Sequence, residues 1–271
     1  MVVQHNLTAM NANRQLGITT SQQAKSSEKL SSGYRINRAA DDAAGLSISE
    51  KMRSQIRGLN KASDNAQDGI SLIQVAEGAL NETHSILQRM NELATQAAND
   101  TNVTVDRDSI NDEMEQLKEE LTRIADTTEF NDTKLLNGSF KGKNLQVGAK
   151  EGQTITVSID SMKASAINNV ASVSVSSNST AGSAMSTIQK AIKTVSKQRS
   201  ALGAIQNRLE HTVANLDNIS ENTSAAESRL RDTDMAEEMV NYSKNNILAQ
   251  AGQSMLAQAN QSTQGVLSIL G

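Results

Sequence analysis

The sequence of 271 residues contains no proline, no cysteine and only four aromatic residues, two tyrosines and two phenylalanines. Average usage of about 5% would give about 13 prolines, so no residue enforces a helix break and very long helices become possible. The absence of cysteine excludes disulfides, thiolate metal sites and a thiol nucleophile. Large enclosed cores draw much of their buried area from aromatic side chains. The interior is therefore expected to consist of aliphatic residues in thin helix-on-helix layers.

Long apolar runs are also missing. No stretch approaches about 18 uninterrupted apolar residues, so no segment is expected to span a membrane. The first residues, MVVQHNLTAMNAN, lack a basic region followed by an apolar run, so we expect no cleaved secretory signal.

Charge is unevenly distributed along the chain, whose formal net charge is −4. Residues 1–57 carry 8 basic and 4 acidic side chains, whereas residues 58–150 carry 9 basic and 16 acidic ones. Residues 245–271 carry no charged side chain. Such a segment is too polar for lipid and too apolar for an ordinary solvated tail. Because residues 1–13 are similarly free of Lys, Arg, Asp and Glu, we expect both ends to be buried against protein.

One long amphipathic helix is expected from about Leu59 to about Asn99. Its apolar positions alternate spacings of four and three residues, which is the heptad pattern of a coiled coil. A second row that recurs every seven residues widens the apolar face. The heptad positions are Leu72, Ala76, Ala79, Thr83, Ile86, Met90, Leu93 and Ala97, and the second row contains Ile73, Leu80, Leu87 and Ala94.

Further helices are expected on both sides of this one. A helix begins at Asp106 or Asp108, which suit a capping position. Another begins near Met185 and can pair antiparallel with the first long helix, because the intervening segment returns the chain. A fourth runs from about Thr233 to Gln264. A weaker N-terminal helix is indicated by Leu7, Met10 and Leu16.

A β-hairpin is predicted at about residues 140–159, where apolar and polar residues alternate on both sides of a glycine-containing turn. Residues 160–183 are rich in Ser, Asn, Ala and Val and are expected to form a short, weakly structured excursion. The expected fold class is mainly α, with long antiparallel helices in a coiled-coil-like bundle and a small β-hairpin subdomain. The alternating apolar positions are Leu145, Val147, Ile155, Val157 and Ile159.

No constellation of catalytic residues is found. The three histidines, His5, His84 and His211, are far apart, and no metal-ligand spacing, phosphate-binding loop or serine-nucleophile motif accompanies them. Basic residues in the first 57 positions lack interleaved aromatic residues for base stacking, which argues against nucleic-acid binding. We therefore expect no metal, no cofactor and no enzymatic activity.

Asp41 and Asp42 are adjacent carboxylates in the stretch RAADDAAGLSISEKM. Neighbouring residues on a helix project about 100° apart and do not share a face, so this pair does not suit acid/base catalysis. We instead expect one of the two aspartates to cap the following helix. Together with Arg35 and Arg38 they would form an ion-paired connector.

Several long blocks of the sequence resemble bacterial flagellins. The likeness covers nearly the whole chain. Residues 160–183 stand where many flagellins insert outer domains, so the resemblance indicates a minimal flagellin without them. The blocks include LTAMNANRQL, LSSGYRINRAADDAAGLSISEKM and ILQRMNELATQAAND in the N-terminal half, FNDTKLLNGSF and LQVGAKEGQTITVSI in the middle, and SALGAIQNRLEHTVANLDNISENTSAAESRLRDTDMAEEMV and QANQSTQGVLSIL near the C-terminus.

The resemblance implies a structural subunit, without enzymatic activity, that polymerises into the flagellar filament used for motility. Residues 1–44 and 226–271 would form the inner coiled-coil domain, which is disordered in free subunits of the family and folds on assembly. Residues 45–159 and 184–225 would form the rod-like outer domain, interrupted by the short variable residues 160–183.

The resemblance also implies several partners besides other copies of the chain. Family members are exported unfolded by the flagellar type III apparatus, and an export chaperone would hold Thr233–Gly271. Filament cap and hook-associated proteins would contact the assembled filament. The connector residues Arg35, Arg38, Asp41 and Asp42 would pack between subunits.

Toll-like receptor 5 of a vertebrate host is a further implied partner. The receptor-binding residues of the family correspond here to Gln88, Arg89, Leu93 and Glu113. This sequence has Met90 and Asn91 where valine and arginine are common in the family. The same patch is expected to pack between subunits in a filament.

Other functions are weighed against this one. A hook–filament junction protein of the same family shares the terminal blocks, but the complete matches at both ends favour a filament subunit. A coiled-coil adhesin or lipid-surface binder would need a basic polar face on its helices, and the acidic residues 58–150 argue against anionic membranes.

Overall fold

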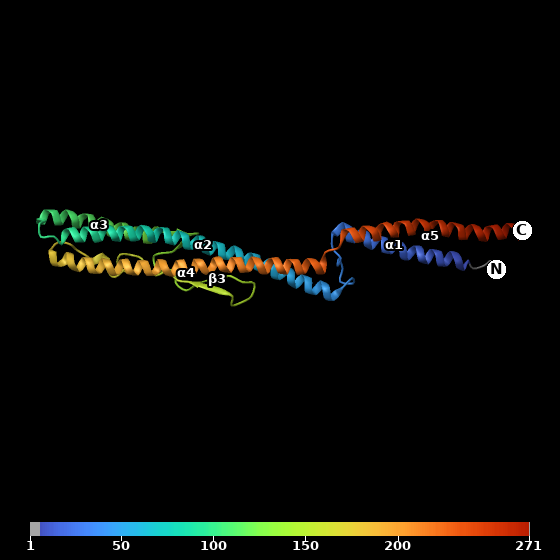
Figure 1. The fold of residues 1–271 in the computed structure, drawn as a ribbon, viewed down its shortest axis with the longest axis horizontal. Helices are drawn as coiled ribbons and strands as arrows, with labels where there is room; N and C mark the ends of the chain where they lie inside the picture. Colours follow the sequence, from blue (N-terminus) through green and yellow to red (C-terminus); the bar gives the residue numbers. More distant parts are fainter. Residues whose placement is uncertain (1–5, 271) are drawn as a thin grey trace. The chain divides into compact units, whose positions relative to one another are not determined.

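Five long helices and two small strand pairs make up the described part of the chain (Figure 1). The computed structural model describes the backbone of residues 6–270 and the side chains of residues 6–262. The fold class expected from the sequence is confirmed. The elements are α1 (Leu7–Ser32), α2 (Ala43–Ala97), α3 (Thr104–Thr127), β1 (Glu129–Phe130), β2 (Thr133–Lys134), β3 (Lys143–Gln146), β4 (Thr154–Val157), the 3₁₀ turn η1 (Val170–Ser172), α4 (Asn178–Arg231) and α5 (Met235–Leu270).

Contacts divide the chain into two units, and α2 and α4 each contribute to both. Met1–Ile56 and Glu221–Gly271 form what we call the terminal unit, and Arg57–Ser220 form the central unit. The domain limits expected from the sequence, after residues 44 and 225, stay predictions.

In the central unit, α2 and α4 run antiparallel (Figure 1). Ser63 Oγ donates to Asp217 Oδ1 at 3.1 Å. Further along, Arg199 Nη2 lies 3.6 Å from Glu77 Oε1. Since residue numbers rise along α2 as they fall along α4, the two helices run in opposite directions. The antiparallel pairing expected from the sequence is confirmed.

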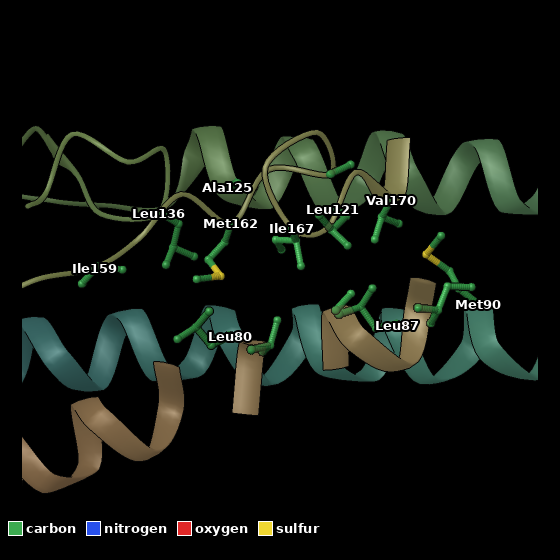
Figure 2. Packing of buried hydrophobic residues seen from close by; sticks show 14 of the residues in the cluster. Leu80, Leu87, Met90, Leu121, Ala125, Leu136, Ile159, Met162, Ile167 and Val170 are labelled. Carbon is green, nitrogen blue, oxygen red and sulfur yellow. The ribbon is translucent and has the colours of Figure 1, made fainter. Parts of the chain in front are cut away.

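The core of the central unit lies where α2, α3, α4 and the chain between β4 and α4 meet. Figure 2 shows side chains of α2 facing side chains of α3 and of the 159–170 segment. Leu80 and Leu87 are completely buried, as is Leu121 on the facing side of α3. Phe140 is the one aromatic residue among the buried side chains described. Aliphatic packing therefore replaces the aromatic core that most domains of this size use.

Residues 160–177 contain only the 3₁₀ turn η1 as regular secondary structure, but they pack into the core of the central unit. Met162 and Ile167 are 1% exposed and Val170 is fully buried in the central core (Figure 2). α4 also begins at Asn178, earlier than the start near Met185 expected from the heptad. The buried residues of this segment follow no helical or strand period. Their burial is set by contact with α2 and α3, which local sequence does not reveal.

Lys118 ties this segment to α3. Its side chain is almost completely buried, and its Nζ donates to the backbone carbonyl of Val173 and, at 2.9 Å, to Glu115 Oε1. A buried cation is stable only with such partners.

Replacing Lys118 by methionine keeps the apolar stem but removes the donor to the Val173 carbonyl. We expect the free energy of unfolding to fall by about 1–3 kcal/mol, because a buried carbonyl loses its partner. Lys134→Met is the matched control, since Lys134 pairs with Glu129 on an exposed hairpin and its loss is expected to cost under about 1 kcal/mol. Urea denaturation followed by circular dichroism measures both. Equal losses for the two variants would contradict the role given to Lys118.

The hairpin expected from alternating residues is confirmed, with Leu145 of β3 opposite Ile155 of β4. A second, shorter hairpin joins β1 to β2 and was not expected. Its turn residues Asn131 and Asp132 have φ values of 47° and 58°. Two consecutive left-handed residues are typical of a type I′ hairpin turn, and asparagine and aspartate tolerate that conformation best after glycine.

The long helix begins at Ala43 rather than near Leu59, so the expected start was wrong. Its first turns do contain apolar residues, among them Leu46, Ile48 and Met52, but the alternating four- and three-residue spacing becomes regular only later. No proline interrupts these turns. Their free backbone N–H groups are capped by Asp42, whose Oδ1 accepts from Gly45 N at 2.8 Å.

In the terminal unit, α1 and α5 lie side by side and antiparallel (Figure 1). Lys29 Nζ lies 3.7 Å from Glu238 Oε2, and Asn6 Nδ2 donates to the Ala259 carbonyl at 2.9 Å near the other end. The seam expected on the terminal helices therefore joins them to each other. Among the described residues, no helix combines the length and apolarity needed to cross a bilayer.

Candidate functional site

The described residues contain no cluster of three or more His, Cys, Asp or Glu side chains that could hold a metal ion. His84 Nε2 lies 3.0 Å from Gln88 Nε2, and His5 lies outside the described residues. The candidate functional features are therefore surfaces and a connector.

Large apolar side chains are exposed along α1 and α5. The most exposed include Val240 at 68% and Ile247 at 66%. Isolated exposed apolar residues are ordinary, but a series of them along two adjacent helices indicates a surface that another protein covers. We call this set the terminal-helix surface, and its members are Leu7, Met10, Ile18, Met235, Met239, Val240, Ile247, Leu248 and Met255.

The seam between α1 and α5 is narrow and made of small or polar residues. The side chains buried there include Ala9, Thr19, Ser26 and Asn245. An apolar groove of about 270 Å³ remains beside the seam, lined in part by Leu16, Leu248 and Met255. Because this seam buries few large side chains, the helix pair gains little stability from its own packing.

The connector holds Asp41 and Asp42 on different backbone donors. Asp42 caps α2, as expected for one of the two aspartates. Asp41 Oδ2 accepts from the backbone N of Arg38 at 2.9 Å and of Asn37 at 3.2 Å, and these bonds hold the pKa of the Asp41 carboxyl below its usual range. The two carboxylates therefore serve separate structural roles.

The arginines of the connector have other partners than expected. Arg38 forms a bidentate pair with Glu28, with Nε at 2.9 Å from Oε1, and Arg35 Nη2 donates to the Leu230 carbonyl at 2.6 Å. In the described structure neither arginine forms a direct salt bridge to Asp41 or Asp42. The expected ion pairing within the segment is thus replaced by an ion pair from Arg38 to α1 and a hydrogen bond from Arg35 to α4. A role between subunits stays a prediction.

Arg231, at the end of α4, contacts residues on both sides of this connector and was not singled out from the sequence. Its guanidinium lies 4.7 Å from the centroid of the Tyr34 ring, and its Nη1 is 2.9 Å from Glu50 Oε1. Its carbonyl accepts from the Arg35 backbone N at 2.6 Å. One signal could have pointed to it: Tyr34 is one of two tyrosines and stands in an otherwise polar stretch.

The structure brings together two of the residues predicted to bind a receptor. Arg89 on α2 and Glu113 on α3 pair with Nε to Oε1 at 2.9 Å, and Arg89 Nη1 lies 3.3 Å from Glu92 Oε2. The hydrogen bond to Glu113 raises the pKa of the Arg89 guanidinium. Gln88 is exposed on the same helix, whereas Leu93 is only 2% exposed and packs in the core.

Two protein-family models match the chain, one on each side of the 160–183 segment. The bacterial flagellin N-terminal helical region matches residues 3–141, and the bacterial flagellin C-terminal helical region matches residues 185–270.

Individual proteins match over all or part of the chain. The chain is 58% identical to a flagellin of Halalkalibacterium halodurans over the whole of both chains. It is 51% identical to a flagellar filament 31.3 kDa core protein of Treponema maltophilum, again over the whole of both. Among solved structures, a crystal structure of Bacillus cereus flagellin has a TM-score of 0.51 and 30% identity, covering 56% of this chain and 88% of that one.

Proposed function

Since the chain belongs to the bacterial flagellin family and is a non-enzymatic structural subunit of the extracellular flagellar filament, we propose that its terminal-helix surface forms contacts between copies in that filament. The observation that carries the proposal is the exposure of large apolar side chains on a helix pair whose own seam is small and polar. Burial of these side chains against other copies would supply the stability that the α1–α5 pair lacks alone.

Charge supports the same proposal. The last 27 residues carry no Lys, Arg, Asp or Glu, so a crowded contact between copies would leave no charge unpaired there. We infer that α1 and α5 are marginal in a free subunit and become fixed when copies polymerise. The connector of Arg35, Arg38, Asp41 and Asp42 would then hold the terminal helices in register with neighbouring copies.

Ile247→Asp tests the proposal at one exposed site of α5. In the free subunit the change is expected to be tolerated, because the side chain is 66% exposed. On polymerisation an unpaired carboxylate would be buried, so the critical concentration for filaments should rise by at least about 100-fold. Ile247→Leu, which keeps the apolar side chain, should polymerise like the native sequence. Sedimentation of filaments measures both variants, and normal polymerisation of Ile247→Asp would exclude this part of α5 from the contact.

The exposed apolar residues of α5 also support the proposal that a chaperone binds this helix before export. We propose that the subunit leaves the cell unfolded through the flagellar type III apparatus, and that an export chaperone covers Thr233–Gly271 until then. A partner that covers Val240 and Ile247 would keep subunits from associating before export. Contacts with the filament cap and hook-associated proteins would follow outside the cell.

We propose Toll-like receptor 5 as a host partner that binds Gln88, Arg89 and Glu113. Leu93, which is buried, would act by packing α2 against the core. The paired Arg89 and Glu113 present a charged, pre-positioned surface across α2 and α3. Replacing both by alanine is expected to weaken binding of the free subunit to the receptor ectodomain by about 10–100-fold, because charge-assisted contacts are lost. Arg123→Ala with Glu120→Ala, an exposed pair elsewhere on α3, is the matched control. Unchanged affinity of the Arg89 and Glu113 variant in surface plasmon resonance would reject this site.

A hook–filament junction protein is not favoured as the alternative. The relatives matched over their whole length are flagellins and filament core proteins.

A further inference from the structure

The solvent-exposed methionines among the described side chains all lie on the two terminal helices. Methionines of the central unit are buried in its core or half-buried. The methionines therefore form two groups that differ in how accessible their sulfur atoms are to solvent. The exposed group is Met10 on α1 at 64%, with Met235 at 48%, Met239 at 52% and Met255 at 64% on α5, whereas Met90, Met114 and Met162 are at most 1% exposed.

A thioether that peroxide can reach is oxidised to a sulfoxide. The sulfur lone pair attacks one oxygen of hydrogen peroxide, the O–O bond breaks, an S–O bond forms, and the other oxygen leaves as water after proton transfer. Sulfur loses two electrons and peroxide gains them. The product is a polar, chiral side chain in place of a flexible apolar one, which disrupts methionine-containing interfaces. Exposure selects which methionines react.

We propose that Met10, Met235, Met239 and Met255 are oxidant-sensitive modification sites, and that their conversion to sulfoxides by hydrogen peroxide stops free subunits from polymerising. The inference rests on the proposed function of the terminal-helix surface, to which all four side chains belong. A filament that covers this surface would protect the same four sulfurs, so sensitivity is a property of the subunit before assembly.

Met255 shows most directly how the modification acts. It lines the apolar groove beside the α1–α5 seam, together with Leu16 and Leu248. A sulfoxide oxygen there would bring a strong hydrogen-bond acceptor into a groove lined mainly by Leu, Ala and Gly, where the Thr19 hydroxyl already donates to the Gln15 carbonyl. Only the Gln15 amide could then serve as a side-chain donor among the lining residues. Met235 and Met239 are one helical turn apart on α5 and would extend the polar change along the helix.

The test compares free subunits and preformed filaments of the full chain after treatment with hydrogen peroxide. Peptide mass spectrometry is expected to find sulfoxides at the four exposed methionines of free subunits, with Met90, Met114 and Met162 unmodified, and much less oxidation of the four in filaments. Sedimentation should show the critical concentration rising by about tenfold for each modified methionine that packs between copies. Methionine sulfoxide reductases should restore polymerisation.

A variant with leucine at all four positions should polymerise and lose its sensitivity to peroxide. Oxidised subunits that polymerise like untreated ones would overturn the inference, as would equal oxidation of the four sites in filaments and subunits. Untreated subunits that never polymerise would instead contradict the proposed function, so the two failures are distinct. If the leucine variant does not assemble, the reversal by reductases on the native sequence still decides the question.

Discussion

A chain that ends at Lys244 is expected to form no filaments at concentrations where the full chain polymerises, while its central unit stays folded. The deletion removes Ile247, Leu248 and Met255 from the terminal-helix surface, and it leaves α1 without most of its partner. The large core cluster of the central unit, by contrast, runs from Ala66 to Leu209 and contains no residue of the deleted segment. Loss of several buried apolar side chains at each copy–copy contact makes this the largest effect on assembly.

Two measurements on the truncated chain separate assembly from folding. Sedimentation and negative-stain electron microscopy report filaments, and thermal unfolding followed by circular dichroism reports the central unit. Mild proteolysis of the free full chain is an independent check, since α1 and α5 should be cut before residues 57–220. Filaments from the truncated chain would contradict burial of α5 between copies. A truncated chain whose central unit no longer unfolds cooperatively would contradict the independence of the two units.

Leu87→Ala is expected to lower the free energy of unfolding of the central unit by about 3 kcal/mol, within a range of about 2–5 kcal/mol. Leu87 is completely buried and faces α3 and the 159–170 segment (Figure 2). With few aromatic side chains in the core, each leucine supplies a large share of the buried area, and the cavity left by its removal is not readily filled. Urea denaturation measures the change.

Val75→Ala on the same helix is the control for Leu87→Ala. Val75 is 41% exposed, so its truncation should change the free energy of unfolding by under about 1 kcal/mol. A loss at Leu87 no larger than the loss at Val75 would show that the second apolar row of α2 does not face a packed core.

Periodicity predicted the helical part of the fold well. Most heptad positions of α2 are buried, but Ala79 and Ile86 are only half-buried. The second row is buried throughout, and the fully buried Ile73, Leu80 and Leu87 place it at the centre of the core. The heptad pattern alone predicts less burial for the second row, because a two-helix coiled coil buries mainly the alternating heptad positions. α3 and the 159–170 segment pack on the other side of α2 and widen its buried face.

Features that depend on tertiary contact could not be read from the sequence. The buried Met162, Ile167 and Val170 do not recur with the period of a helix or a strand. Their part in the core could therefore not be predicted from this serine-rich segment. Lys118 is the one lysine of the acidic helix α3, and only the position of Val173 makes it a buried donor. At the predicted receptor-binding site, the resemblance to flagellins identified Arg89 and Glu113. Their ion pair joins residues 24 positions apart and could be seen only in the structure.

Cryo-electron microscopy of filaments grown from the purified full chain shows directly whether the terminal helices are buried between copies. We expect long filaments of this one subunit, in which α1 and α5 pack against α1 and α5 of other copies and Val240 and Ile247 are covered. Filaments whose terminal helices are absent from the density or remain exposed to solvent would contradict it, as would a concentrated protein that forms no filaments.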